Sequence, residues 1–104
     1  MEGLIGEITG GTVYWNQNML WYRDRQPGWN DCEYMIKDWV NWKWLSGDHI
    51  VEQHVHNIDV FTWFSGLKPV KAVGFGSRHR RITGDQYDNF SVDFTMENGI
   101  HMHS

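Results

Sequence analysis

The chain has 104 residues, a length that suits one domain with a modest hydrophobic core. Hydrophobic residues make up 40% and charged residues 21%, so the composition is that of a globular chain and excludes wholesale disorder. The formal net charge of -4 leaves no basic excess to attract nucleic acid or an anionic membrane, and the single cysteine excludes an intrachain disulfide.

The first half of the chain predicts a strand, a long loop and a short helix. Residues 7–16 predict a strand, in which Gly10 and Gly11 indicate a bulge or a close backbone approach. Residues 17–30 form an irregular loop rich in aromatics, which could cover a ligand or close the end of a small core. Residues 31–45 carry apolar side chains at spacings of three and four and predict a short helix or two turns, with Asp31 as N-cap.

The main helix is predicted over about residues 47–65. Ser46 is a candidate N-cap, and Gly66 suits the residue after the helix, since glycine adopts the left-handed conformation without penalty. The apolar stripe that should face the core consists of Val51, Val55, Ile58 and Thr62, widened by Ile50, Phe61 and Phe64.

Three further strands are predicted over residues 70–81, 89–96 and 100–104. The alternation in residues 89–96 is typical of a strand with one buried face, and Glu97-Asn98-Gly99 predicts a hairpin turn. The fold class that follows is α+β: a mainly antiparallel open sheet of about four strands packed against one main helix, with a long aromatic-rich loop.

The candidate chemistry lies on the main helix. Glu52 and His56 are four residues apart, so a regular helix places them on one face, where the carboxylate can orient the imidazole and raise its pKa. Such a pair can give and take a proton at a carbonyl or alcohol. Asp48 lies one turn earlier on this face, and His49 lies beside it. The competing interpretation is an ordinary polar pair on a solvated helix face.

Metal and dinucleotide sites are less well supported. His49, Glu52 and His56, with His101 and His103, could supply metal ligands for a hydrolase, but their spacing matches no recognised zinc motif, so we predict no metal site. Gly74-Phe75-Gly76 resembles the start of a dinucleotide fingerprint, but the third glycine and the following helix are missing. The basic run of residues 78–81 predicts a solvated strand end or, as an alternative, a phosphate or carboxylate contact.

Residues 46–66 resemble the signature helix of the glucose-fructose oxidoreductase, inositol dehydrogenase and rhizopine-catabolism (Gfo/Idh/MocA) oxidoreductases. Glu52 takes the acidic position of that pattern, usually Asp, and His56 takes the His position, followed by Ile58 and Asp59. Residues 6–16 resemble the first strand of the same C-terminal domain, and residues 69–74, 87–90 and 97–99 resemble the strand and the hairpin after the helix, so the likeness covers nearly the whole chain.

The resemblance implies an enzyme in which a Rossmann domain binds NAD or NADP and a second α/β domain shapes the pocket for a sugar, a polyol or a related hydroxy compound. Enzymes of that family transfer a hydride between the nicotinamide and a carbon of the sugar or polyol. His56 would be the acid/base residue or a contact to a substrate hydroxyl, and Glu52 would orient His56 or contact the nicotinamide side. We expect substrate contacts from Asp48, His49, Trp15, Asn16 and Arg78.

The sequence lacks two motifs of the family's Rossmann domain. It has no glycine-rich fingerprint and no Glu-Lys-Pro segment; Lys68-Pro69 follows Leu67 in another region. Residues 1–104 therefore resemble a single incomplete substrate and oligomerisation domain without its Rossmann domain. We expect it to hold no cofactor and to be inactive alone, the parent enzyme supplying NAD(P).

Partners and location follow from the same features. An open sheet with an exposed apolar face tends to self-associate, so we predict a homo-oligomer formed through the sheet face or edge. We predict no nucleic-acid or membrane partner. No apolar run reaches 18 residues and residues 1–10 lack the features of a signal peptide, so we expect a cytoplasmic location. The alternative function is a standalone ligand-binding or assembly module without catalysis.

Overall fold

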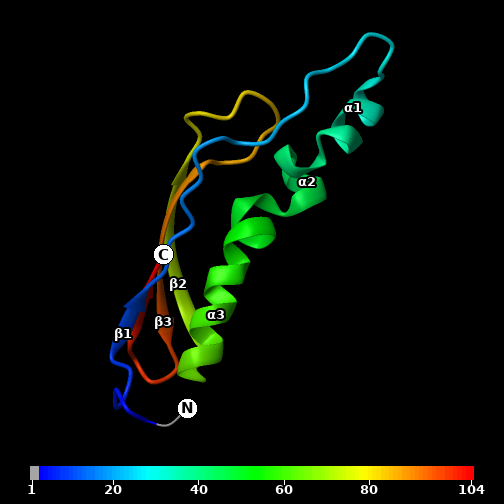
Figure 1. Ribbon diagram of the computed structural model, residues 1–104. Helices are drawn as coiled ribbons and strands as arrows, with labels where there is room; N and C mark the ends of the chain where they lie inside the picture. Colours follow the sequence, from blue (N-terminus) through cyan, green and yellow to red (C-terminus); the bar gives the residue numbers. More distant parts are fainter. Residues whose placement is uncertain (1–2) are drawn as a thin grey trace.

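The computed structural model describes residues 3–104. Its elements are β1 (Gly10–Thr12), α1 (Asp31–Lys37), the 3₁₀ turn η1 (Trp39–Asn41), α2 (Lys43–Ser46), the π-helical turn η2 (Ile50–His54), α3 (Val55–Ser65), β2 (Pro69–Ser77), β3 (Asn89–Met96) and β4 (His101–His103). The predicted α+β class is confirmed, with an open four-stranded sheet beside one long helical stretch (Figure 1).

The strands lie in the order β1-β4-β3-β2. β2 pairs antiparallel with β3, and β3 pairs antiparallel with β4, whereas β1 runs parallel to β4. The predicted hairpin is confirmed: the amide of Met96 donates to the carbonyl of Ile100 at 2.8 Å, and Gly99 has a φ of 87° in the three-residue turn. The turn sets the register that places Phe94 opposite Met102.

The core is a thin layer between the sheet and the helix. Met96 and Met102 are fully buried, and Val92 is nearly so. Phe94 pairs across the sheet with Ala72 on one side and Met102 on the other, and Met102 pairs with Gly11. A Cβ at Gly11 would lie 2.4 Å from the Phe61 ring of α3, so the predicted close approach at this glycine is where the helix rests on the sheet.

Two predicted strands are longer than the strands observed. The strand expected over residues 7–16 pairs only from Gly10 to Thr12, because its partner β4 offers just three residues. The strand expected over residues 70–81 begins at Pro69 and ends at Ser77. Beyond Ser77 the backbone amides of residues 79–81 donate to the side chain of Asp88 and leave the ladder.

The predicted helical stripe is wrong in its first two turns. Val51 and Val55 are 60% and 41% exposed, whereas His54 is buried. The cause is η2: a π turn holds more residues than an α turn and so rotates the side chains before it relative to those after it. The inward positions are Ile50, His54, Ile58 and Phe61. The C-terminal end is as predicted, with Gly66 at a φ of 69°.

Residues 17–46, which we call the aromatic arm, extend away from the sheet (Figure 1). The single helix expected over residues 31–45 is divided into α1, η1 and α2. Asn30, rather than Asp31, caps α1 by accepting from the amide of Glu33 at 2.8 Å. Ser46 does not cap the main helix; it ends α2, and its hydroxyl donates to the carbonyl of Trp42 at 3.0 Å.

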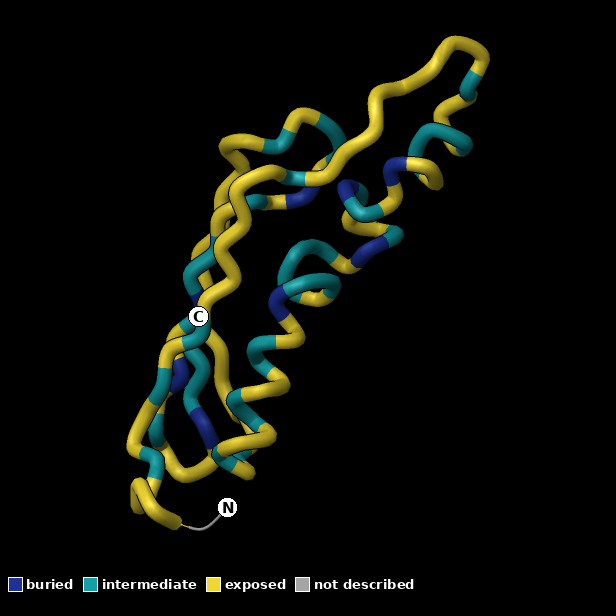
Figure 2. The backbone as a smooth tube through the Cα atoms, viewed as in Figure 1, coloured by how far each residue is buried: buried dark blue, intermediate teal, exposed yellow. Residues whose placement is uncertain are grey.

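The chain is elongated, with principal extents of 59 × 26 × 23 Å. Its radius of gyration of 17.2 Å exceeds the roughly 13 Å typical of a compact chain of this length. Buried backbone is confined to short stretches, while all of β2 is exposed (Figure 2). Within residues 3–104, no helix combines the length and the apolar composition that a bilayer crossing requires.

Candidate functional site

A polar cavity of about 140 Å³ lies where the segment after β1 passes the start of the long helix and the start of β3. A smaller cavity of about 60 Å³ adjoins it, and the two share Trp15, His49, Asp88 and Asn89. We call them together the proximal cleft. Its other lining residues are Val13, Tyr14, Asn16, Gln17, Leu20, His54, Arg80, Arg81, Phe90 and Ser104.

An unusual backbone conformation leads into the helix beside this cleft. Gly47 and Asp48 both have left-handed backbone, with φ of 78° and 72°. Such a conformation costs a residue other than glycine on the order of 1 kcal/mol and is concentrated at functional sites. The Asp48 carboxylate accepts from the backbone amide of His49 at 2.7 Å, and this hydrogen bond offsets part of the cost of the left-handed backbone. His49 therefore enters the helix with its side chain lining the cleft.

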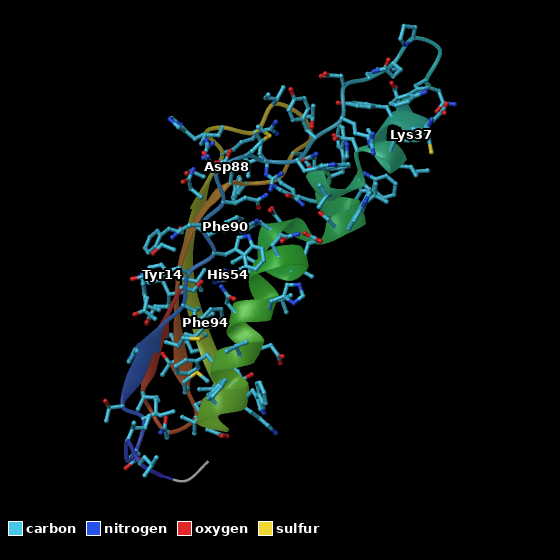
Figure 3. All side chains as sticks on the ribbon, viewed as in Figure 1. Tyr14, Lys37, His54, Asp88, Phe90 and Phe94 are labelled. Carbon is cyan, nitrogen blue, oxygen red and sulfur yellow. The ribbon has the colours of Figure 1, made fainter. Side chains whose placement is uncertain are left out.

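The π turn brings His54 into the same cleft. His54 is buried, and its Nε2 shares a hydrogen bond with the Ser104 hydroxyl. Ser104 is fixed in turn by two backbone hydrogen bonds of 2.8 Å with Val92 of β3. Burial lowers the pKa of His54, which favours a neutral ring at neutral pH. Figure 3 shows His54 directed from the helix toward the strands.

His49 completes a layer of flat rings. It stacks on Phe90, with centroids 5.6 Å apart and planes at 13°, and lies 6.5 Å from the ring of His54. Burial, then the charge of Arg81 and that of His54 when it is protonated, lower the pKa of His49, although Asp48 and Glu52 oppose the shift. A neutral imidazole offers one donor and one acceptor, which is the pattern that a substrate hydroxyl can satisfy.

Asp88 shapes the opposite wall. Its carboxylate accepts from the amides of His79 at 2.9 Å, Arg80 at 2.6 Å and Arg81 at 2.7 Å. Burial would raise the pKa of Asp88, but these hydrogen bonds, led by those of Arg80 and Arg81, hold the pKa below its usual value. Asp88 therefore stays ionised and holds residues 79–81 beside the cleft. Figure 3 shows Asp88 and Phe90 in sequence along this wall.

The predicted site residues fall into two groups. Trp15, Asn16 and His49 line the proximal cleft. Asp48 is half-buried and acts through the His49 amide. Arg78 is directed elsewhere: its guanidinium donates to the carbonyls of Arg81, Thr83 and Gly84, and so ties the connector together.

The predicted catalytic pair is not joined in the described part of the chain. His56 is exposed and lies beside the cleft, with its ring 6.2 Å from that of Trp15. Glu52 is half-buried, and its carboxylate accepts from the side-chain amide of Gln53. Because Glu52 lies inside the π turn, the spacing of four does not bring its carboxylate into hydrogen-bond contact with the His56 imidazole.

Sequence reasoning missed His54, Asp88 and Ser104. His54 had a usable signal, because it lies four residues after Ile50 and four before Ile58, both apolar and both directed inward. Asp88 lies in the family-like segment 87–90, but its hydrogen bonds to the amides of residues 79–81 follow from no regular pattern. Ser104 had no signal, because its partner His54 lies 50 residues earlier.

Within residues 3–104, the candidate metal ligands and the candidate dinucleotide glycines do not assemble into a site. In residues 3–104, no three His, Cys, Asp or Glu side chains come together as a metal would require. His101 instead pairs with Asp93 at 2.7 Å on β3. Gly74 and Gly76 lie within the edge strand β2, and the next element is β3 rather than a helix. The strand–turn–helix that holds a pyrophosphate is therefore not formed by these glycines.

The fold and the cleft define an α+β domain that presents a polar, aromatic-lined cavity at one end of an open sheet. The chain belongs to the GFO/IDH/MocA C-terminal domain family, whose model matches residues 1–104. This confirms the resemblance found in the signature helix. Enzymes of that oxidoreductase family typically use NAD(P). Comparison with curated proteins and with solved structures gave no match.

Proposed function

We propose that the chain is the substrate-side domain of an NAD(P)-dependent oxidoreductase acting on a sugar, a polyol or a related hydroxy compound. The observation that carries the proposal is that Trp15, Asn16 and His49 line one cavity although they come from two distant segments. An aromatic face beside planar polar side chains suits a ring that carries hydroxyls. Family membership supports the same chemistry.

In this proposal His56 is the acid/base residue. Its imidazole is exposed and lies at the edge of the cleft beside Trp15, so it is accessible to a bound hydroxyl. Orientation of His56 by Glu52 stays a prediction, and it requires the Glu52 carboxylate to leave Gln53 when substrate binds. Gly74 and Gly76 lie in β2 and do not form the strand–turn–helix of a pyrophosphate site, so in this proposal the dinucleotide is bound by protein outside residues 3–104.

The catalytic proposal is tested in the oxidoreductase that carries this domain. His56→Asn should lower kcat by about 100-fold or more, the usual contribution of a general acid–base group. The matched control is His103→Asn, at an exposed position of β4, which should retain kcat. An unchanged kcat in His56→Asn would exclude this role for His56.

We propose further that the domain forms a homo-oligomer through the sheet. Its edge strand β2 is exposed along its whole length, and Val70, Val73 and Phe75 are among its exposed side chains. Light scattering at micromolar concentration should give the mass of a dimer or a larger assembly. A mass equal to that of one chain would contradict this proposal without affecting the cleft.

A further inference from the structure

A third cavity adjoins the proximal cleft. This cavity has a volume of about 350 Å³ and shares Leu20, Arg80 and Arg81 with the cleft, so the two lie side by side. We call the third one the distal cavity. Its other lining residues are Asn18, Met19, Trp21, Tyr22, Asn41 and Ile82. A single sugar ring in the proximal cleft would leave the distal cavity open to a second group.

The walls of the distal cavity define the kind of group that fits. Five of its side chains are apolar or aromatic: Met19, Leu20, Trp21, Tyr22 and Ile82. The charged side chains that line it in the described part of the chain are Arg80 and Arg81, both positive, although the whole chain has a net charge of -4. The cavity therefore combines a ring-sized apolar wall with a local positive charge.

Arg81 is available to an anion. Its Nε donates to the carbonyl of Tyr87 at 3.1 Å and its Nη1 to the Asn41 amide oxygen, and both of these acceptors are neutral. Its Nη2 has no hydrogen-bond partner within residues 3–104. Burial lowers the pKa of Arg81, although Asp88 and Asp48 act in the opposite direction. A half-buried guanidinium with a free donor gains most from a carboxylate, which forms short charge-assisted hydrogen bonds with it.

We propose that the distal cavity is a second substrate subsite that takes the acidic ring of a uronic-acid-containing glycoside, whose other ring occupies the proximal cleft. This inference rests on the proposed function, because it assumes that the proximal cleft binds a sugar. The carboxylate pairs with Arg81, and the second ring lies against the apolar wall. The substrate class is thereby narrowed from any sugar to an acidic disaccharide or a longer glycoside.

The test uses the ¹⁵N-labelled 104-residue chain and its tryptophan indole N–H signals. Trp15 reports on the proximal cleft and Trp21 on the distal cavity, and Trp→Phe variants at these two positions assign the signals. Cellobiouronic acid should shift both signals and bind about tenfold more tightly than cellobiose, the usual gain from one charge-assisted contact. Inorganic phosphate should shift neither signal at the same concentration.

A matched pair of variants tests the charge. Ile82 lines the distal cavity and is 69% exposed, so both Ile82→Asp and Ile82→Asn should fold. Ile82→Asp should abolish the preference for the acidic disaccharide, whereas Ile82→Asn should retain most of it. Equal loss in both variants would overturn the charge argument.

The titration distinguishes an error in the distal subsite from an error in the proposed sugar-binding function. If both disaccharides shift Trp15 but leave Trp21 unmoved, the distal subsite is wrong and the proposed function stands. If neither disaccharide shifts Trp15, the sugar-binding function itself is wrong. If phosphate alone shifts Trp21 as strongly as cellobiouronic acid, the distal cavity is a simple anion site rather than a glycoside subsite.

Discussion

The sheet and the long helix are joined by apolar side chains, whereas the aromatic arm is joined to the rest of the chain by buried polar groups. In the first region Met96, Met102 and Phe61 fill the space above the sheet. In the second, Asp38, Asn41 and Gln86 are almost fully buried. Apolar packing therefore stabilises the first region, and hydrogen bonds between buried polar groups stabilise the second. The proximal cleft lies where the two regions meet.

The polar junction is an ordered network. The Asp38 carboxylate accepts from the Arg23 amide at 2.7 Å and from the Asn41 side chain at 2.8 Å. The Asn41 carbonyl accepts from the amide of Asp85 at 3.0 Å, and its side-chain oxygen accepts from Arg81. A Cβ at Gly84 would lie 1.9 Å from that carbonyl, so only glycine fits there. Through Arg81 the arm positions one wall of both cavities.

The largest expected effect lies in the apolar region. Met96→Ala should lower the free energy of unfolding by about 3 kcal/mol, because it removes a fully buried side chain and leaves a cavity. Urea denaturation followed by circular dichroism measures the change. Met19→Ala, at a position that is 82% exposed, is the control and should change stability little. Equal effects would mean that the apolar layer is not the core.

A smaller and more local effect is expected in the polar region. Asp38→Ala should destabilise the arm by about 2 kcal/mol, because the Arg23 amide and the Asn41 side chain lose their acceptor. Hydrogen exchange should show faster exchange in α1 and η1, with β3 unchanged. Asp38→Asn keeps one acceptor oxygen and should cost less. Uniform acceleration across the chain would show that arm and sheet unfold as one unit.

The smallest effect is the dependence of stability on pH. Burial lowers the pKa of His49 and of His54 in the folded chain, so the unfolded chain binds more protons just below pH 6.5. The contribution of the two neutral histidines to the free energy of unfolding should therefore be fully present above pH 7. It should be lost as the pH decreases through 6.5. His54→Gln should reduce this loss, whereas His79→Gln, at an exposed position, should retain it. An unchanged slope in His54→Gln would mean that His54 is not buried as described.

The measurement must stay above the range in which Asp88 titrates. The pKa of Asp88 is held below its usual value, so its contribution to stability is present above about pH 4 and is lost only as the pH falls further. Unfolding curves between pH 5 and pH 8 therefore isolate the histidines.

The two regions also differ in how far their structure follows from sequence. The hairpin, Gly66 and the alternation in β3 depend on neighbours along the chain, so local patterns predict them. The division of residues 31–45 depends on contacts with residues 81–86, which no local pattern encodes. The long helix is predicted only in part. Its existence follows from the periodicity of apolar residues, but the π turn, which buries His54 and leaves Val55 exposed, does not.

The same limit applies to the site. Trp15 and Asn16 were predicted from the family resemblance and His49 from its place beside Asp48 on the helix, and all three line one cavity. Contact between Glu52 and His56 was predicted from a spacing of four, which assumes a regular helix and does not hold across η2. Residues that act through tertiary contacts, such as Ser104, needed the fold before they could be recognised.

The most direct test of the central claim is a titration of the ¹⁵N-labelled chain with myo-inositol. The claim is that the proximal cleft binds a ring that carries hydroxyls. The indole signal of Trp15 should shift in a saturable manner, while that of Trp63, which is 74% exposed on α3, stays in place. A Trp15 signal that does not move while the chain remains folded, or one that moves no more than Trp63, would contradict the account.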